Sequence, residues 1–127
     1  RILHKLMQKT NDQNTLILGV LHDAIEDSTM TIADLIEQGY STEVTSDLLL
    51  MTKAKGEDYE NSYIPRIARS YRCILVKLED LTHNSDIRRL KGVSEKDLER
   101  MAKYHRSYLY LLQKKYESSV FSNIAKG

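Results

Sequence analysis

Residues 15–27 read TLILGVLHDAIED, and this stretch decides the fold class. Projected at about 100° per residue, its apolar side chains lie on every side of a helix, which is typical of a buried helix. Its polar residues gather at the C-terminal end, where His22, Asp23, Glu26 and Asp27 share less than half of the helix surface. The stretch therefore predicts a buried helix that brings an imidazole and three carboxylates to one place.

Helical spacing of apolar residues continues through the rest of the chain, and no segment alternates with a period of two. We therefore predict an all-α protein, a single compact bundle of about six to eight helices. We expect one domain over residues 1–127 that lacks a natural N-terminal piece, because the first residue is Arg1, and that ends in a polar tail at 118–127. The expected helices lie at 15–26, at 32–38 (started by Thr31 and Asp34, ended by Gly39), from Ser41 or Thr42 to Met51, at 67–90, and from the cap formed by Ser94 and Asp97 onward.

The last helix carries a stripe of mostly apolar residues at steps of three or four. We predict that this stripe faces the core and that His105, which belongs to it, is a core histidine. The residues of the stripe are Leu98, Met101, His105, Tyr108, Leu112 and Tyr116.

Composition excludes several classes of protein. Lys and Arg number 19 against 18 Asp and Glu, which gives no support for a nucleic-acid partner. The single cysteine, Cys73, cannot form an internal disulfide and favours a reducing compartment. No apolar run is long enough to span a membrane and no signal peptide opens the chain, so we expect a cytoplasmic protein without a membrane partner.

A second acidic cluster follows at residues 77–84, which read KLEDLTHN. Asp80 and Asn84 lie four residues apart and therefore share a helix face, next to a long apolar stretch. Burying the carboxylates of both clusters together is costly unless a cation compensates them. Imidazole and carboxylate ligands suit Mn, Fe or Zn better than Ca. The alternative without a functional role is that these polar residues at a helix end face solvent.

The pair His22-Asp23 with a distant Asp80 resembles the HD superfamily of metal-dependent phosphohydrolases. The fuller set is similar to the hydrolase domain of the Rel/SpoT alarmone enzymes and their small single-domain relatives: HDxxED at 22–27, MTK at 51–53, KLxDxxHN at 77–84 and RxxxY at 100–104. The resemblance implies an HD-type helical domain that cleaves a phosphate or pyrophosphate ester of a nucleotide. Its first candidate substrate is guanosine 3′,5′-bis(diphosphate), cleaved at the 3′-pyrophosphate.

The resemblance also implies a role for each matching residue. The metal ligands are His22, Asp23 and Asp80, with Mn²⁺ the usual metal and Fe or Zn as alternatives. The acidic pair that positions or deprotonates the attacking water is Glu26 and Asp27. The residues that contact the nucleotide substrate are Lys53, Asn84, Arg100 and Tyr104.

Three alternatives remain at this stage. The chain is an HD phosphohydrolase acting on another nucleotide, such as a nucleoside monophosphate. Otherwise it is a nucleotide-binding module that has lost catalysis, which the absence of an upstream His-Pro and the presence of Leu81 after Asp80, where the alarmone enzymes have a basic residue, would favour. The third alternative is a purely structural helical domain.

Overall fold

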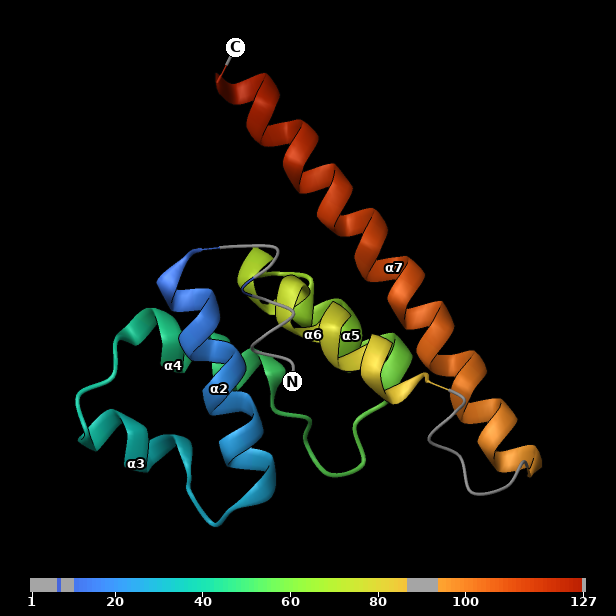
Figure 1. The fold of residues 1–127 in the computed structure, drawn as a ribbon, viewed down its shortest axis with the longest axis horizontal. Coiled ribbons are helices and arrows are strands. Elements are labelled where there is room, and N and C mark those ends of the chain that lie inside the picture. The colour runs from blue at the N-terminus through green and yellow to red at the C-terminus, as the bar shows by residue number, and fades with distance from the viewer. Residues whose placement is uncertain (1–6, 8–10, 87–93, 127) are drawn as a thin grey trace.

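The computed structural model describes residues 7, 11–86 and 94–126, and in this part of the chain it contains helices and no strand. The predicted all-α fold is therefore confirmed. Figure 1 shows that the longest helix, α7, runs past α5 and α6 and extends beyond the rest of the bundle. The elements are α2 (Gln13–Asp27), α3 (Ile32–Glu37), α4 (Thr42–Met51), the π-helix η1 (Tyr59–Tyr63), α5 (Ile64–Ile67), α6 (Tyr71–Asn84) and α7 (Glu95–Lys126). None of the helices in the described part is long and apolar enough to cross a membrane.

Side-chain caps explain where the helices begin. The predicted capping box at α3 is present, because Thr31 accepts from the backbone N–H of Asp34 and Asp34 accepts from that of Thr31. Ser41 accepts from Val44 and starts α4 as predicted. The third predicted cap is also confirmed, since Ser94 and Asp97 bond reciprocally at the start of α7.

Helix α6 is the centre of the core. Its residues from Cys73 to Leu81 are all buried, and it packs against α2, α4, α5 and α7. Leu18 on α2, Leu48 on α4 and Leu111 on α7 are each at most 2% exposed and belong to the same cluster. Because α6 is covered on several sides, even the charged residues on its inner turns are enclosed.

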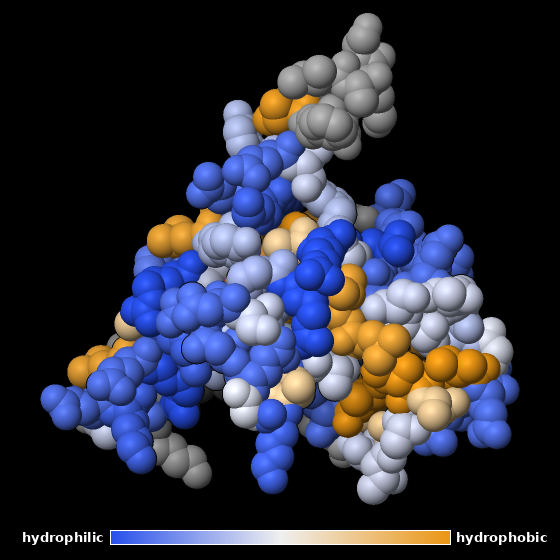
Figure 2. Space-filling model, turned by 180° about the vertical axis from the view of Figure 1, so that it is seen from behind, coloured by the Kyte–Doolittle hydropathy of each residue, from blue (hydrophilic) through white to orange (hydrophobic). Residues whose placement is uncertain are grey.

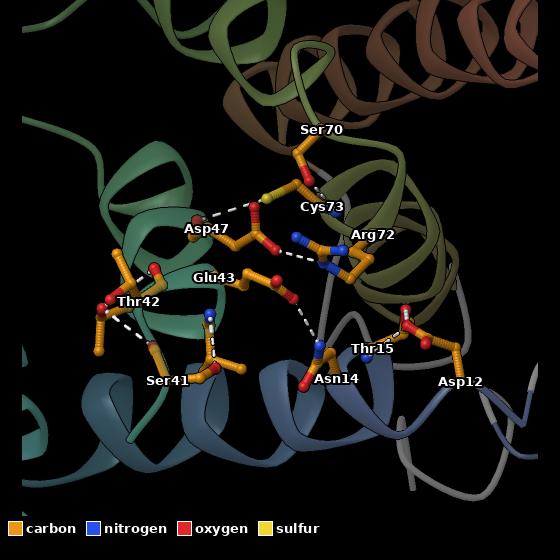
Figure 3. Close-up of polar contacts among 12 residues, drawn as sticks. Asp12, Asn14, Thr15, Ser41, Thr42, Glu43, Asp47, Ser70, Arg72 and Cys73 are labelled. Carbon is orange, nitrogen blue, oxygen red and sulfur yellow. Dashed lines mark hydrogen bonds and ion pairs between the residues drawn. The ribbon is translucent and has the colours of Figure 1, made fainter. Parts of the chain in front are cut away.

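Polar contacts fix α2 and α6 against α4 (Figure 3). Arg72 Nε on α6 lies 2.6 Å from Asp47 Oδ2 on α4, and the Cys73 thiol donates to the Asp47 carbonyl oxygen at 3.3 Å. Asn14 Nδ2 on α2 donates to Glu43 Oε2 on α4 at 2.8 Å. These contacts hold the two helices that carry the acidic clusters in a fixed relation to a common neighbour.

The expectation that α2 is buried on every side holds only in part. Leu18 and Leu21 are buried, but Val20 is 45% exposed and borders an apolar hollow of about 260 Å³ that Tyr40 also lines. Seen from behind, the molecule shows hydrophobic side chains gathered on one side of an otherwise mostly polar surface (Figure 2). The exposed Val20 thus leaves part of the outer side of α2 apolar and not enclosed.

The predicted helix at 67–90 begins four residues before the observed helix α6 and extends past its end at Asn84. A short helix ends at Ile67, and α6 begins at Tyr71, where the Ser70 side chain accepts from the Cys73 N–H. Ser70 is therefore a cap that breaks the segment in two, and α6 ends at Asn84. Residues 87–90 lie outside the described part of the chain.

The predicted register of α7 holds only in part, since Tyr108 of the predicted stripe packs against the core but most of the stripe does not. Ser107 and Leu111 are buried against the bundle, whereas Leu112 is 40% and Tyr116 71% exposed, and His105 is exposed rather than a core histidine. The face toward α6 is thus rotated by about one residue from the predicted stripe. The predicted tail differs as well, because α7 continues through Lys126.

Two neighbouring leucines test the register of α7. We expect Leu111→Ala to lower the free energy of unfolding by about 2–5 kcal/mol, because it leaves a cavity at a fully buried position. Leu112→Ala, the matched control, should cost less than about 1 kcal/mol. Urea unfolding of both variants measures the difference, and equal losses would contradict the observed packing.

The single cysteine reports on the core. Burial raises the pKa of the Cys73 thiol to about 12. In the unfolded chain the thiol ionises near its ordinary pKa of about 8.5, so stability is fully present below that pH and falls as the pH rises toward 12. We expect Cys73 to resist Ellman's reagent at pH 8 and to react promptly once urea unfolds the protein. Rapid reaction of the folded protein would contradict this burial.

Candidate metal centre

The contact between α2 and α6 brings the two acidic clusters together. His22 and Glu26 are four residues apart on α2 and so lie on one face of it. Asp80 lies on the buried part of α6. One ligand atom from each of these three residues lies within 4.8 Å of the other two. The central geometric expectation, that Asp80 returns to the helix of His22, is therefore met.

The imidazole of His22 is the least satisfied group of this cluster. The residue is 4% exposed, and its Nε2 atom has no hydrogen-bond partner within the described part of the chain. Nε2 lies 3.4 Å from Oε1 of Glu26. A cation bound to this nitrogen would satisfy a group whose burial is otherwise costly, and the Glu26 carboxylate would then lie beside that cation.

Asp80 is held from two sides. It is 6% exposed, and its Oδ2 atom accepts from Lys77 Nζ at 2.8 Å. Its Oδ1 atom accepts from Asn84 Nδ2 at 3.2 Å, one helical turn further along α6. The carboxylate is therefore oriented by its own helix before any ligand is considered.

Glu26 is the open side of the cluster. Its side chain is 54% exposed, while those of His22 and Asp80 are 5% and 9% exposed. Partial desolvation raises the pKa of Glu26 above its ordinary value, and the nearby charges of Asp80 and Asp23 add to this rise against the opposing effect of His22 and Lys77. A carboxylate with a raised pKa that solvent can reach is suited to taking a proton from water.

The structure regroups the predicted metal ligands. His22 and Asp80 belong to the three-residue group, but its third member is Glu26, predicted as catalytic, instead of Asp23. Asp23 is half-buried on the next position of α2, and its charge reaches Glu26. The side chain of Asp27 lies outside what the structure describes.

The four predicted nucleotide contacts fall into two pairs. Asn84 touches Asp80, and the Tyr104 ring packs on that of Tyr59 at 5.8 Å between centroids. The other two residues are exposed and engaged near their own positions, Lys53 with the Ala54 carbonyl and Arg100 with Asp97. The structure thus brings Asn84 to the cluster and places Tyr104 against Tyr59, which lies next to Lys77. Among the residues that the structure describes, Lys53 and Arg100 make no contact with the cluster.

Sequence reasoning gave no role to Lys77, although this residue contacts Asp80 directly. Lys77 is 5% exposed, and its ammonium group lies 5.2 Å from the Tyr63 ring and 5.8 Å from the Tyr59 ring. The usable signal was its position three residues before Asp80 on an apolar helix, which forces both charges onto the same enclosed face.

Comparison with known proteins adds no relative: no family model matches this chain, and no curated protein matches it. The arguments for this site therefore depend on its geometry and on the motif resemblance.

Metal analysis tests the cluster directly. We expect the protein to take up Mn²⁺ when it is dialysed against buffer that contains the ion, and Asp80→Asn to take up much less because the variant removes the charge of a buried ligand. Glu37→Gln, which neutralises an exposed carboxylate of α3 outside the group, should leave the metal content unchanged. Equal metal content in all three proteins would argue against the site.

Proposed function

We propose that this chain is a metal-dependent phosphohydrolase that cleaves a phosphate or pyrophosphate ester of a nucleotide. The observation that carries the proposal is the buried His22 Nε2, which has no hydrogen-bond partner among residues 7, 11–86 and 94–126 and is grouped with the carboxylates of Glu26 and Asp80. The motif resemblance favours guanosine 3′,5′-bis(diphosphate) as substrate, cleaved at the 3′-pyrophosphate.

The donor set decides which ion the site would hold. One imidazole with carboxylates suits Mn²⁺, Fe²⁺ or Zn²⁺, and the resemblance favours Mn²⁺. His22 and Asp80 would bind the ion, and the resemblance adds Asp23 as a further ligand. When bound, such an ion supplies positive charge that acidifies water and offsets the charge on phosphoryl oxygens.

The chain's own residues supply the proton acceptor, the positioning of Asp80 and the contacts with the nucleotide. Glu26, half-exposed and with a raised pKa, accepts the proton of the attacking water. Asn84 and Lys77 keep the Asp80 carboxylate in place. Tyr104 packs on Tyr59 and offers an aromatic face to a nucleobase or sugar, with Lys103 Nζ 4.7 Å from the Tyr59 ring as a nearby positive charge for phosphate.

A nucleotide-binding module without catalysis is the second candidate. It is favoured by Arg100 and Lys53, which are bonded to their own neighbours instead of to the cluster, and by Leu81 in place of a basic residue. Such a module would bind nucleotide with Mn²⁺ but release no product.

Product release separates these candidates. We expect pyrophosphate to be released from guanosine 3′,5′-bis(diphosphate) in the presence of Mn²⁺, and Glu26→Gln to slow release by about 10²–10⁴-fold, since it removes the proton acceptor. Glu37→Gln is the matched control and should retain full activity. Phosphate release from a panel of nucleoside monophosphates tests the alternative that the chain hydrolyses another nucleotide.

Binding without turnover of any nucleotide, with metal shown to be in the site, would favour the non-catalytic module. Turnover that is unaffected by Glu26→Gln would contradict the role assigned to that carboxylate.

A further inference from the structure

The ammonium group of Lys77 already binds the Asp80 carboxylate, which a metal ion would also bind. Its Nζ atom donates to Asp80 Oδ2 at 2.8 Å, and the two side chains are 6% and 9% exposed. The contact is therefore a nearly enclosed ion pair between an ammonium group and a carboxylate.

This ion pair does not serve to join parts of the fold. Lys77 and Asp80 are three residues apart on the same helix, so their contact ties no two helices together. By contrast, Arg72 on the same helix reaches Asp47 on α4 and does connect two elements. A buried pair of charges has a desolvation cost that its attraction often fails to offset, so stability does not explain the pair, although the ammonium also lies over the Tyr59 and Tyr63 rings of η1.

We propose that Lys77 is a built-in counter-cation that compensates Asp80 while the site is empty and thereby sets its affinity for a divalent metal. This inference depends on the metal centre of the proposed function. The ammonium and the ion share one carboxylate, and two cations a few ångströms apart repel each other. Lys77 therefore weakens metal binding and makes it reversible, while it keeps the metal-free site folded.

This role has a signature that a merely structural lysine would not give. Removing the ammonium leaves the buried Asp80 without its main compensating charge, so the metal-free protein becomes less stable. The same change removes the repulsion, so the ion binds more tightly. Stability without metal and affinity for metal should thus change in opposite directions.

The experiment compares Lys77→Met and Lys77→Gln with the wild-type chain. Mn²⁺ affinity is measured by calorimetric titration, and the melting temperature is measured with and without Mn²⁺. We expect at least about tenfold tighter Mn²⁺ binding, because like charges this close repel appreciably even in water. We also expect a lower melting temperature without metal and a larger rise on adding Mn²⁺ than in the wild type.

Two further variants serve as controls. Lys77→Arg keeps the positive charge and should bind Mn²⁺ with nearly wild-type affinity. Lys114→Met removes a lysine from the same three-residue spacing, with Glu117 on α7, but on the exposed surface, and should change neither quantity.

Unchanged or weaker Mn²⁺ binding by a folded Lys77→Met or Lys77→Gln would overturn the proposal. It would also be overturned if both variants failed to fold in the presence of Mn²⁺, since the ion is expected to replace the ammonium. Tighter binding without nucleotide hydrolysis would overturn only the phosphohydrolase function. Absence of Mn²⁺ binding in the wild type and in every variant would overturn the metal centre and this proposal together.

Discussion

The carboxylate of Asp80 is the constraint on which the candidate site depends. It is almost fully enclosed between α6 and its neighbours, where an uncompensated negative charge is very unfavourable. Lys77 and Asn84 from the same helix bind this carboxylate, and the imidazole of His22 on α2 lies within 4.8 Å of it. The burial of His22 and Asp80 beside the more exposed Glu26 accounts for both the unsatisfied His22 Nε2 in the described part of the chain and the raised pKa of Glu26.

Much of the fold could be predicted because its signals are local. The capping box of Thr31 and Asp34 and the caps at Ser41 and Ser94 are set by residues within three positions of each other. The helical spacing of His22 and Glu26 was equally local. The meeting of α2 with α6 was predictable only as an inference from chemistry and from the motif resemblance, since buried carboxylates need a partner and Asp80 lies in an apolar stretch of its helix.

The errors share a physical cause, which is tertiary packing. Residues 104–112 carry aromatic and aliphatic side chains on several sides of α7, so two neighbouring registers both look amphipathic, and contact with α6 selects the one that buries Ser107 and Leu111. The exchange of Glu26 for Asp23 in the cluster depends on a rotation of α2 of less than a third of a turn. The role of Lys77 depends on the Tyr59 and Tyr63 rings, which come from a loop segment whose π-helical turn has no clear sequence signal.

The division of the donors between helices has one more consequence. Two of the three grouped side chains lie on α2 and one on α6, and residues 28–70 separate these helices along the chain. A peptide of either helix alone cannot assemble the set, and an ion bound there would act as a clasp between distant segments, at the entropic cost of closing a long loop. Occupancy would then report on the integrity of the whole bundle, because any loosening of α2 from α6 pulls the donors apart.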